Sequence, residues 1–503
     1  MPDDKVTRLE SLAQEAVDAV TPGAQVAEGV ERADVDAVNR KEDRSLYAKR
    51  KRIHPKRAYG TFRSLKWFIM AATLGIYYIT PWIRWDRGEG PDQAVLLDLP
   101  NRKFYFFFVE IWPQEIYLLT GVLVISALAL FLFTSLFGRV WCGYSCPQTV
   151  WTDLFIAVER FVEGDRNARL RLDKAPWTGS KIGKKAAKHA IWLIIAVMTG
   201  GAWVFYFRDA PTLMVELATL QAPMPAVLFI GIFTFTTYAL GGLMREQVCI
   251  YMCPWPRIQG AMFDEDSLLV TYREHRGEPR AAHKKGESWD GRGDCIRCRQ
   301  CVVVCPMGID IRDGPQLECI HCALCIDACN EVMTKIGRPP NLISYETYRN
   351  LEAAKRGERA PVRFLRPRII AYGVLLCAVS ALMLYGLFSR ETLSLSVLRD
   401  RNPLFVMLSD GSVRNGYTLK IINREREARI FRVEMAGVEG GKLSLMGGVM
   451  RDVEVPADDL RSVRLFVLGP APSDGKQDLT ITVTDPVDGR RATDQTTFRG
   501  PEQ

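Results

Sequence analysis

Long apolar runs alternate with strongly polar stretches along the 503-residue chain. About 20 consecutive helical residues suffice to cross the hydrocarbon layer of a membrane. The pattern therefore predicts a polytopic α-helical membrane protein with five transmembrane helices. Of the five runs, 190–207 supports its helix least, because it is short and interrupted by glycine. The runs cover residues 67–85, 116–138, 190–207, 226–244 and 369–388.

The pattern changes after the fifth run. Short segments rich in β-branched residues follow one another, separated by turn sequences such as Ser409-Asp-Gly411. About seven strands in roughly 110 residues predict an all-β sandwich over residues 389–503. We expect strands at 404–409, 416–423, 428–435, 449–455, 461–468, 477–484 and 491–498.

Three other segments have patterns of their own. Residues 148–163 carry apolar side chains at helical spacing, which predicts an interfacial helix rather than a spanning one. Phe104–Val109 is too short to span, so we expect a partly buried strand or an interfacial segment. Residues 1–45 are polar, acidic and rich in alanine, without the apolar core of a signal peptide, and predict a disordered tail.

The positive charges are distributed unevenly over the loops. Residues 46–66, 139–189 and 355–368 are rich in Lys and Arg, whereas 86–115 and 208–225 contain few. The positive-inside rule therefore places the N-terminus in the cytoplasm, and five spans then place the C-terminal domain in the periplasm. The net charge of +8 and the basic flank of the first span would also suit nucleic acid, but its position against an apolar run favours the membrane reading. We expect membrane lipid as a partner and no nucleic acid.

Twelve of the thirteen cysteines fall into four tight groups. Two of these groups have the spacing Cys-x2-Cys-x2-Cys-x3-Cys, which is typical of bacterial ferredoxins with two [4Fe–4S] clusters. In such a run three thiolates hold one cluster, and the fourth ligates the other. The predicted ligand sets are Cys295, Cys298, Cys301 and Cys329 for one cluster, and Cys319, Cys322, Cys325 and Cys305 for the other.

The alternatives to clusters are zinc and disulfide bonds. Zinc sites need four ligands per ion and no interlocked quartets, and disulfides are rare in the cytoplasm. One departure from the ferredoxin pattern is Asn330, which stands where a proline usually follows the fourth cysteine. The pattern thus predicts a cytoplasmic ferredoxin-like insert within residues 245–368.

The remaining two groups form an internal repeat. Cys142 and Cys146 follow the second span and Cys249 and Cys253 follow the fourth, each pair in a Cys-x-Tyr-x-Cys-Pro sequence. Cysteines at i and i+4 share one helical face, and soft thiolates prefer Cu(I), zinc or iron–sulfur centres. Met252 could add a thioether. The competing interpretation is that these cysteines are small packing residues. The occurrence of two such pairs at the same depth in the membrane argues against it.

Two further residues have roles that the sequence leaves open. His321 lies beside Cys322 and either donates a hydrogen bond to a cluster sulfur or faces solvent. Cys377 stands alone inside the fifth span, where we expect ordinary packing.

The chain resembles a known family in three sequences: Trp141–Trp151, Arg245–Trp255 and Cys305–Gly314. They look like those of the bacterial cytochrome c oxidase accessory proteins of the CcoG/FixG/RdxA type. The resemblance covers about residues 40–500 and implies an inner-membrane polyferredoxin with five spans and a C-terminal immunoglobulin-like domain. It also implies reduction of Cu(II) to Cu(I) for assembly of the cbb(3)-type oxidase, with Cys142, Cys146, Cys249 and Cys253 as the copper site.

This resemblance sets the expected organisation and partners. A membrane domain at 46–244 contains four spans and the interfacial helix, and the fifth span covers 369–388. We expect an electron donor from outside the chain, because no G-x-G-x-x-G follows a strand. Copper would come from a chaperone or a copper-exporting ATPase and pass to oxidase assembly factors, and a homodimer is left open.

Two other functions remain open at this point. One is a ferredoxin-type membrane subunit that relays electrons between quinol and a periplasmic reductase, with the thiol pairs serving electron transfer or structure. The other is a copper-responsive anchor or sensor, which would leave eight cluster ligands without a task.

Overall fold

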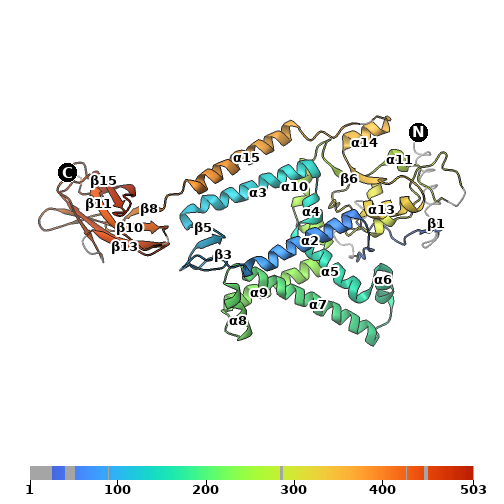
Figure 1. Cartoon of the computed structure of the whole chain (residues 1–503), viewed down its shortest axis with the longest axis horizontal. Coiled ribbons are helices and arrows are strands. Elements are labelled where there is room, and N and C mark those ends of the chain that lie inside the picture. Colours follow the sequence, from blue (N-terminus) through green and yellow to red (C-terminus); the bar gives the residue numbers. More distant parts are fainter. Residues whose placement is uncertain are drawn as a thin grey trace. The chain divides into compact units, whose positions relative to one another are not determined.

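The computed structural model describes residues 25–39, 51–88, 90–283, 287–358, 360–425, 427–446 and 451–501. The chain divides into two compact units, Met1–Met383 and Leu384–Gln503, and each is treated by itself (Figure 1).

Four of the predicted spans correspond to helices long and apolar enough to cross a membrane, within the described residues. In α9 the last turns widen into a π-helical segment, η3. The boundary between the two units falls inside the last of these helices. The four are α3 (Ile116–Phe137), α7 (Gly179–Val204), α9 (Met224–Thr236) with η3 (Thr237–Met244), and α15 (Pro367–Phe388).

The first predicted span differs from the other four. The helix α2 (Thr61–Ile79) starts six residues before the apolar run 67–85 and is followed by a 3₁₀ turn, η1 (Thr80–Trp82). Its first two turns contain Arg63 and Lys66, both buried against other helices. These two cations lower the apolar character of α2, so the chain has four clear candidates and the count of five is not confirmed.

Smaller elements connect the long helices. The predicted strand at 104–109 is present as β4 (Lys103–Phe106) and β5 (Val109–Ile111), which pair antiparallel with β3 (Val95–Asp98). Three short helices complete this part of the chain: η2 (Pro113–Glu115), α6 (Arg166–Lys174) and α8 (Ala210–Ala218).

The internal repeat is visible in the helices. After α3 comes the short helix α4 (Val140–Tyr144) and then α5 (Pro147–Glu163). After η3 comes the π-helical turn η4 (Val248–Met252) and then α10 (Trp255–Met262). In both copies a proline near the start of the last helix ends the preceding one, because the residue before proline disfavours helical backbone.

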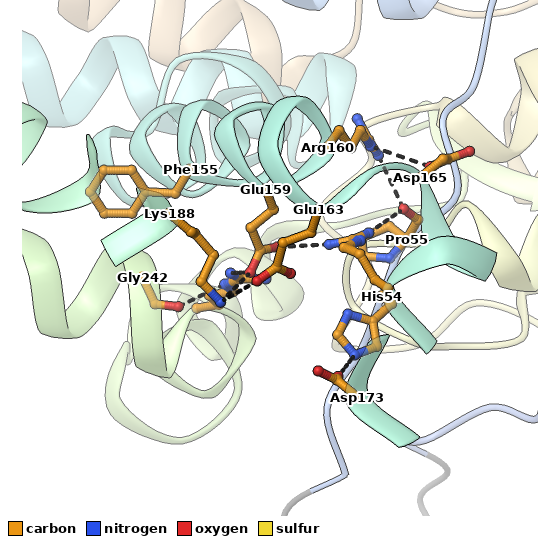
Figure 2. Close-up of polar contacts among 12 residues, drawn as sticks. His54, Pro55, Phe155, Glu159, Arg160, Glu163, Asp165, Asp173, Lys188 and Gly242 are labelled. Atoms are coloured by element: carbon orange, nitrogen blue, oxygen red, sulfur yellow. Dashed lines mark hydrogen bonds and ion pairs between the residues drawn. The ribbon is translucent and has the colours of Figure 1, made fainter. Parts of the chain in front are cut away.

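The helix α5 is present as predicted, but its buried face is more polar than its apolar pattern indicates. Asp153, Glu159 and Glu163 are all buried, and each is compensated by cations, as burial of a charge requires. Figure 2 shows Glu159 and Glu163 directed toward Lys188 of α7. The ion pairs are Arg63–Asp153 at 2.8 Å, Arg169–Glu159 at 2.7 Å, Arg245–Glu159 at 2.6 Å, Lys185–Glu163 at 3.0 Å and Lys188–Glu163 at 3.1 Å.

The ferredoxin-like part belongs to the same unit as α2–α10. Asp327, on the helix α13 (Leu324–Lys335), accepts hydrogen bonds from the backbone N–H groups of Phe62 and Arg63, at 3.3 and 2.7 Å. It thereby caps the N-terminus of α2. The other elements are β6 (Leu269–Tyr272) paired with β7 (Ile343–Glu346), and α11 (Glu274–Gly277), α12 (Gln300–Val303), η5 (Ile311–Asp313) and α14 (Tyr348–Lys355).

The N-terminal prediction is wrong for residues 25–39; residues 1–24 and 40–45 lie outside the described part. The strands β1 (Gln25–Ala27) and β2 (Val30–Glu31) form a small hairpin whose apolar side chains join the ferredoxin core. The backbone N–H of Ala33 donates to the carbonyl of Cys298 at 2.9 Å. A few apolar residues with a long-range partner were enough to order an otherwise polar segment.

The second unit is all β, as predicted. Its two antiparallel sheets have the orders β12-β14-β10-β8, with β9 also on β10, and β13-β11-β15-β16. Their inner faces form one apolar core around Tyr417, Phe431 and Phe498. The sequence analysis missed β8 and β12. The strands are β8 (Leu393–Arg399), β9 (Val406–Met407), β10 (Val413–Asn423), β11 (Arg429–Ala436), β12 (Lys442–Leu445), β13 (Asp452–Val455), β14 (Asp459–Gly469), β15 (Lys476–Thr484) and β16 (Arg491–Arg499).

Candidate iron–sulfur and thiol sites

The eight ferredoxin-type cysteines lie around two neighbouring cavities. The first cavity, site A, is lined by Cys295, Cys298, Cys301 and Cys329. The second, site B, is lined by Cys305, Cys319, Cys322 and Cys325, with Cys301 at its edge. In each case the fourth cysteine comes from the other run, as the predicted exchange of ligands requires.

Local structure explains this exchange. Arg297, Arg299, His321 and Ala323, the residues between the closely spaced cysteines, adopt left-handed backbone conformations. The chain therefore wraps around each cavity. The x3 gaps continue along α12 and α13, so that Cys305, just after α12, and Cys329, on α13, are carried away from the other cysteines of their own runs.

The thiols of both sites are shielded from water. Burial raises the pKa of Cys298 to about 11 and that of Cys305 to about 12. Without bound metal these thiols are therefore protonated at neutral pH, and binding of an iron centre releases their protons. Two largely apolar cavities, each lined by its predicted quartet of cysteines, fit one [4Fe–4S] cluster each.

Four of the remaining five cysteines form what we term the thiol site: Cys142, Cys146, Cys249 and Cys253. The helices of the repeat exchange partners to bring the two pairs together. On α5, Gln148 donates to the carbonyls of Leu240 and Arg245 beside the second pair, at 2.8 and 3.1 Å. On α10, Trp255 stacks on Phe131 of α3. Each helix that follows one pair thus packs against the span that precedes the other.

The thiols of this site lie within electrostatic range of one another. Burial, and then the neighbouring thiols, raise the pKa of Cys142 and of Cys249 to about 12. The thiol of Cys142 donates a hydrogen bond to the side-chain oxygen of Gln259 on α10, at 3.2 Å. Cys253 is exposed, whereas the other three are partly buried, so the thiol site opens to its surroundings at Cys253.

The first pair is in direct contact with site B. A Cβ atom on Gly143 would lie 2.6 Å from the carbonyl oxygen of Ile320 and 3.1 Å from Cα of Cys322. Only glycine permits this approach of α4 to the site B loop. The phenol of Tyr144 adds a hydrogen bond to the carbonyl of Cys322 at 3.3 Å.

The solvent-facing alternative for His321 is wrong, whereas its hydrogen bond to a cluster sulfur stays a prediction. His321 is buried rather than exposed to solvent, and its Nδ1 accepts a hydrogen bond from the backbone N–H of Arg139 at 3.0 Å. Burial, with Arg139 nearby, lowers the pKa of His321 to about 3, so the ring is neutral and can accept. His321 therefore joins the site B loop to the turn before the first pair. Cys377 is exposed on α15, so it does not pack within the described unit.

The spacing of the thiols limits what they can hold without rearrangement. Among the described residues, no three Cys, His, Asp or Glu side chains are grouped closely enough to bind a single metal ion. For sites A and B this agrees with a cluster, whose four thiolates bind four different irons. For the thiol site it means that the two pairs must close around a single ion.

Sequence reasoning missed two groups around these sites. It did not find the buried acids of α5, because their period coincides with that of the apolar residues. It also missed Arg139, which lies three residues before Cys142 and is buried at the junction of α4, α10 and the site B loop. An arginine before each cysteine pair, Arg139 and Arg245, was the signal available in the sequence.

Comparisons with known proteins agree with this architecture. Residues 244–348 match a family model described as a 4Fe-4S dicluster domain, and residues 119–163 match a 4Fe-4S binding domain. Residues 383–501 match the IG-like fold at the C-terminal of FixG.

Similar proteins extend over nearly the whole chain. The nitrogen fixation protein FixG of Rhizobium meliloti is 51% identical over 509 residues, covering 94% of this chain and 97% of FixG. Protein RdxB of Cereibacter sphaeroides is 52% identical over 466 residues, covering 91% and 98%. A crystal structure of a FixG-related protein from Vibrio parahaemolyticus, 19% identical, covers 22% of this chain and 97% of its own, with a TM-score of 0.20. That last likeness is too weak to carry an argument.

Apolar helices beside two cysteine-lined cavities define a membrane-bound iron–sulfur electron-transfer protein. The extent and identity of the matches identify its family. The chain belongs to the FixG/RdxA family.

Proposed function

We propose that this protein is an oxidoreductase that reduces Cu(II) to Cu(I) at the thiol site, for assembly of a cbb(3)-type cytochrome c oxidase. The observation that supports it most is the contact of Gly143 with Ile320 and Cys322. This contact places a pair of soft metal ligands against the backbone of a cluster ligand. A metal bound by Cys142 would thus lie one packed layer from site B.

Each set of residues has a defined task in this proposal. When bound, the [4Fe–4S] clusters supply one-electron transfer at sites A and B. Cys301 lines both cavities, which gives a short path from site A to site B. Tyr144 and Gly143 hold α4 against Cys322, so the path continues to the thiol site.

The thiol site binds copper as substrate. Thiolates stabilise Cu(I) over harder cations, and Cys253, with Met252 beside it, provides exposed soft ligands at which copper can arrive. Bound Cu(II) would be reduced to Cu(I) by one electron from the cluster that Cys305, Cys319, Cys322 and Cys325 would hold, and no bond to the protein other than the metal–thiolate bonds would change. Protons leave the buried thiols when the metal binds.

The location of these tasks is part of the proposal. The basic flanks favour a cytoplasmic N-terminus and cytoplasmic residues 245–368, and with α2 as a fifth span the β-sandwich would lie in the periplasm. A cytoplasmic or membrane electron donor would then act at the clusters. Phosphatase fused after Gln503 should be active and phosphatase fused near Ser288 inactive; the reverse pattern would contradict this orientation.

The central test removes the cysteine pairs separately and together. We expect Cys142→Ala/Cys146→Ala and Cys249→Ala/Cys253→Ala each to weaken Cu(I) binding by more than about tenfold. The iron content should be unchanged. Reduction of Cu(II) by dithionite-reduced protein should fall in parallel. Cys377→Ala, which removes an exposed cysteine far along the sequence, is the control. A quadruple variant that kept both copper binding and cupric reduction would overturn the proposal.

One observation favours a second function. The 4Fe-4S binding domain model covers residues 119–163, whose cysteines are Cys142 and Cys146. If the two pairs together held a third cluster, the protein would be the relay between quinol and a periplasmic reductase. Purified protein would then contain about twelve irons instead of about eight, and the quadruple variant would lose about four of them.

A further inference from the structure

Arg139 is a fully enclosed cation between the two sites. Its side chain is among the largest that are completely buried, and only 2% of the residue is exposed. Its guanidinium donates to three backbone carbonyls, those of Leu317, Cys319 and Pro256. Two of these belong to the site B loop, and the third opens the helix after Cys253.

The charge of Arg139 has no carboxylate partner. Within the part of the chain that the structure describes, no Asp or Glu forms an ion pair with it. The groups in electrostatic range are the thiols of Cys142, Cys319 and Cys253, together with Glu318. Its hydrogen bonds to neutral carbonyls engage both terminal nitrogens, whereas the buried Nε has no hydrogen-bond partner among the described residues. They do not cancel the buried positive charge, which is costly without an ion-pair partner.

The second half of the repeat shows how such a charge is otherwise compensated. Arg245 lies four residues before Cys249, one position further from its pair than Arg139 lies from Cys142. It forms an ion pair with Glu159 on α5 at 2.6 Å and donates to the carbonyl of Gly242 at 2.8 Å; Figure 2 shows Glu159 and Gly242 in this network. Arg245 thus forms an ion pair with a carboxylate, whereas Arg139 has the thiols of Cys142 and Cys319 as its strongest electrostatic neighbours, followed by Glu318.

We propose that Arg139 is a positioning residue that supplies the shared positive charge for site B and the thiol site when both are loaded. Four thiolates around a cluster or around copper carry net negative charge, and Arg139 is the buried cation that faces ligands of both. It stabilises the reduced form of site B, which has one more negative charge than the oxidised form. It also stabilises the thiolate complex of Cu(I). The second effect rests on the proposed function, whereas the first does not.

The test compares four proteins: the wild type, Arg139→Met, Arg139→Lys and Arg245→Met. The first measurement is a redox titration of the cluster signals by EPR in copper-free protein with full iron content. We expect one of the two midpoint potentials to become more negative in Arg139→Met. Arg139→Lys, which keeps the charge but not the planar fork, should stay near the wild type. Arg245→Met should change both midpoints less, because Glu159 keeps Arg169 as a partner.

The second measurement is the Cu(I) affinity, determined by competition with a chromogenic chelator. We expect a roughly tenfold or larger loss in Arg139→Met, as one nearby charge produces at a moderate effective dielectric constant. Arg139→Lys should recover most of it. If wild-type protein bound no Cu(I), the proposed function would fail while the redox titration still tested Arg139.

Two results would overturn the inference. One is an unchanged pair of midpoint potentials in Arg139→Met with full iron content. The other is an Arg139→Lys variant as impaired as Arg139→Met, because a purely structural role depends on the hydrogen-bonding fork and not on the charge. If Arg139→Met failed to keep its clusters, the comparison of Arg139→Lys with the wild type would still decide between these roles.

Discussion

The two Cys-x-Tyr-x-Cys-Pro segments have the same spacing but different surroundings. In the first, Gly143 and Tyr144 pack directly on the backbone of the site B loop. In the second, the residue at the position of Gly143 is Ile250, and a small cavity lined by Cys249, Met307 and Ile320 lies between the segment and the same loop. The second segment also ends in the exposed Cys253.

In the proposed function, this difference would divide the work of one copper site between two copies of a motif. The first copy is fixed against site B, where a rigid, short contact would favour electron transfer. The second is less enclosed, and its π-helical turn leaves Tyr251, Met252 and Cys253 exposed, which would suit the arrival and departure of copper. A repeat that looks symmetric in the sequence is therefore asymmetric in what it contacts.

The largest effect should come from removing the electron supply beside the first segment. Cys305→Ser removes a site B ligand that lies in the run of site A. We expect the iron content to fall from about eight to about four per chain and cupric reduction to cease. Iron analysis with EPR checks this, with Cys377→Ser as the control. Loss of the site A signal instead would show that the quartets are assigned incorrectly.

The next test exchanges the residues that distinguish the two segments. Gly143→Ile places a side chain against the Ile320 carbonyl and the Cys322 backbone. We expect it to destabilise the docked ferredoxin part by about 3 kcal/mol, as overpacking against backbone does, and to slow the oxidation of reduced clusters by Cu(II). Thermal unfolding and stopped-flow absorbance measure the two effects.

Ile250→Gly is the matched control for that exchange. It should leave the rate of cluster oxidation near that of the wild type, because removal of the partly buried Ile250 side chain, which packs on the ferredoxin core, introduces no clash with the site B backbone. Equal slowing of cluster oxidation in both variants would contradict the asymmetry between the two segments.

A smaller effect concerns the accessibility of the thiols. In metal-free protein at pH 8, Cys253 should react with iodoacetamide roughly tenfold or more faster than Cys142, which is partly buried and whose pKa is raised to about 12. Because only the thiolate reacts, alkylation of Cys142 should rise about tenfold per pH unit below that pKa. Peptide mass spectrometry over time measures both, and similar rates for the two cysteines would contradict the open side at Cys253.

The smallest effect should come from removing a single hydrogen bond beside the first Cys-x-Tyr-x-Cys-Pro segment. Tyr345 donates to the carbonyl of His321 at 2.6 Å, and His321 in turn holds the turn before α4. Tyr345→Phe should cost about 1 kcal/mol of stability and leave iron and copper contents unchanged. Tyr348→Phe, on a partly exposed tyrosine of α14, is the control, and a loss of iron in Tyr345→Phe would give that tyrosine a larger role.

Much of the architecture could be predicted from local patterns. The apolar runs at 116–138 and 369–388 nearly coincide with α3 and α15, since the length of a spanning helix is set by the membrane alone. The spacing of the eight cysteines indicated two interlocked quartets, and the structure places each predicted quartet around one cavity. The alternation of β-branched residues predicted the sandwich but not the short strand β12, which depends on its pairing with β14.

Other features depended on contacts far apart in the sequence. Residues 25–39 are polar enough to predict disorder, and they are ordered by hydrogen bonds to Cys298 and Gly308. The cations Arg63 and Lys66 in the first turns of α2 make this helix a poor candidate for a membrane span. They can be buried there because Asp153 of α5 lies beside them. Neither partner can be identified from the local pattern.

The sequence by itself determined which chemistry the protein carries, because ligand type and spacing are local properties of the chain. It determined eight cysteines suited to two clusters, four more in repeated pairs, and the apolar helices that hold them. Only the tertiary structure decided that α5 and α10 exchange partners, that Gly143 lets α4 approach Cys322, and that Arg139 is enclosed without an ion pair to any described carboxylate. These features arise from packing between segments that are distant in the sequence. The effect of a buried charge or of a missing side chain depends on which residues the fold brings next to it.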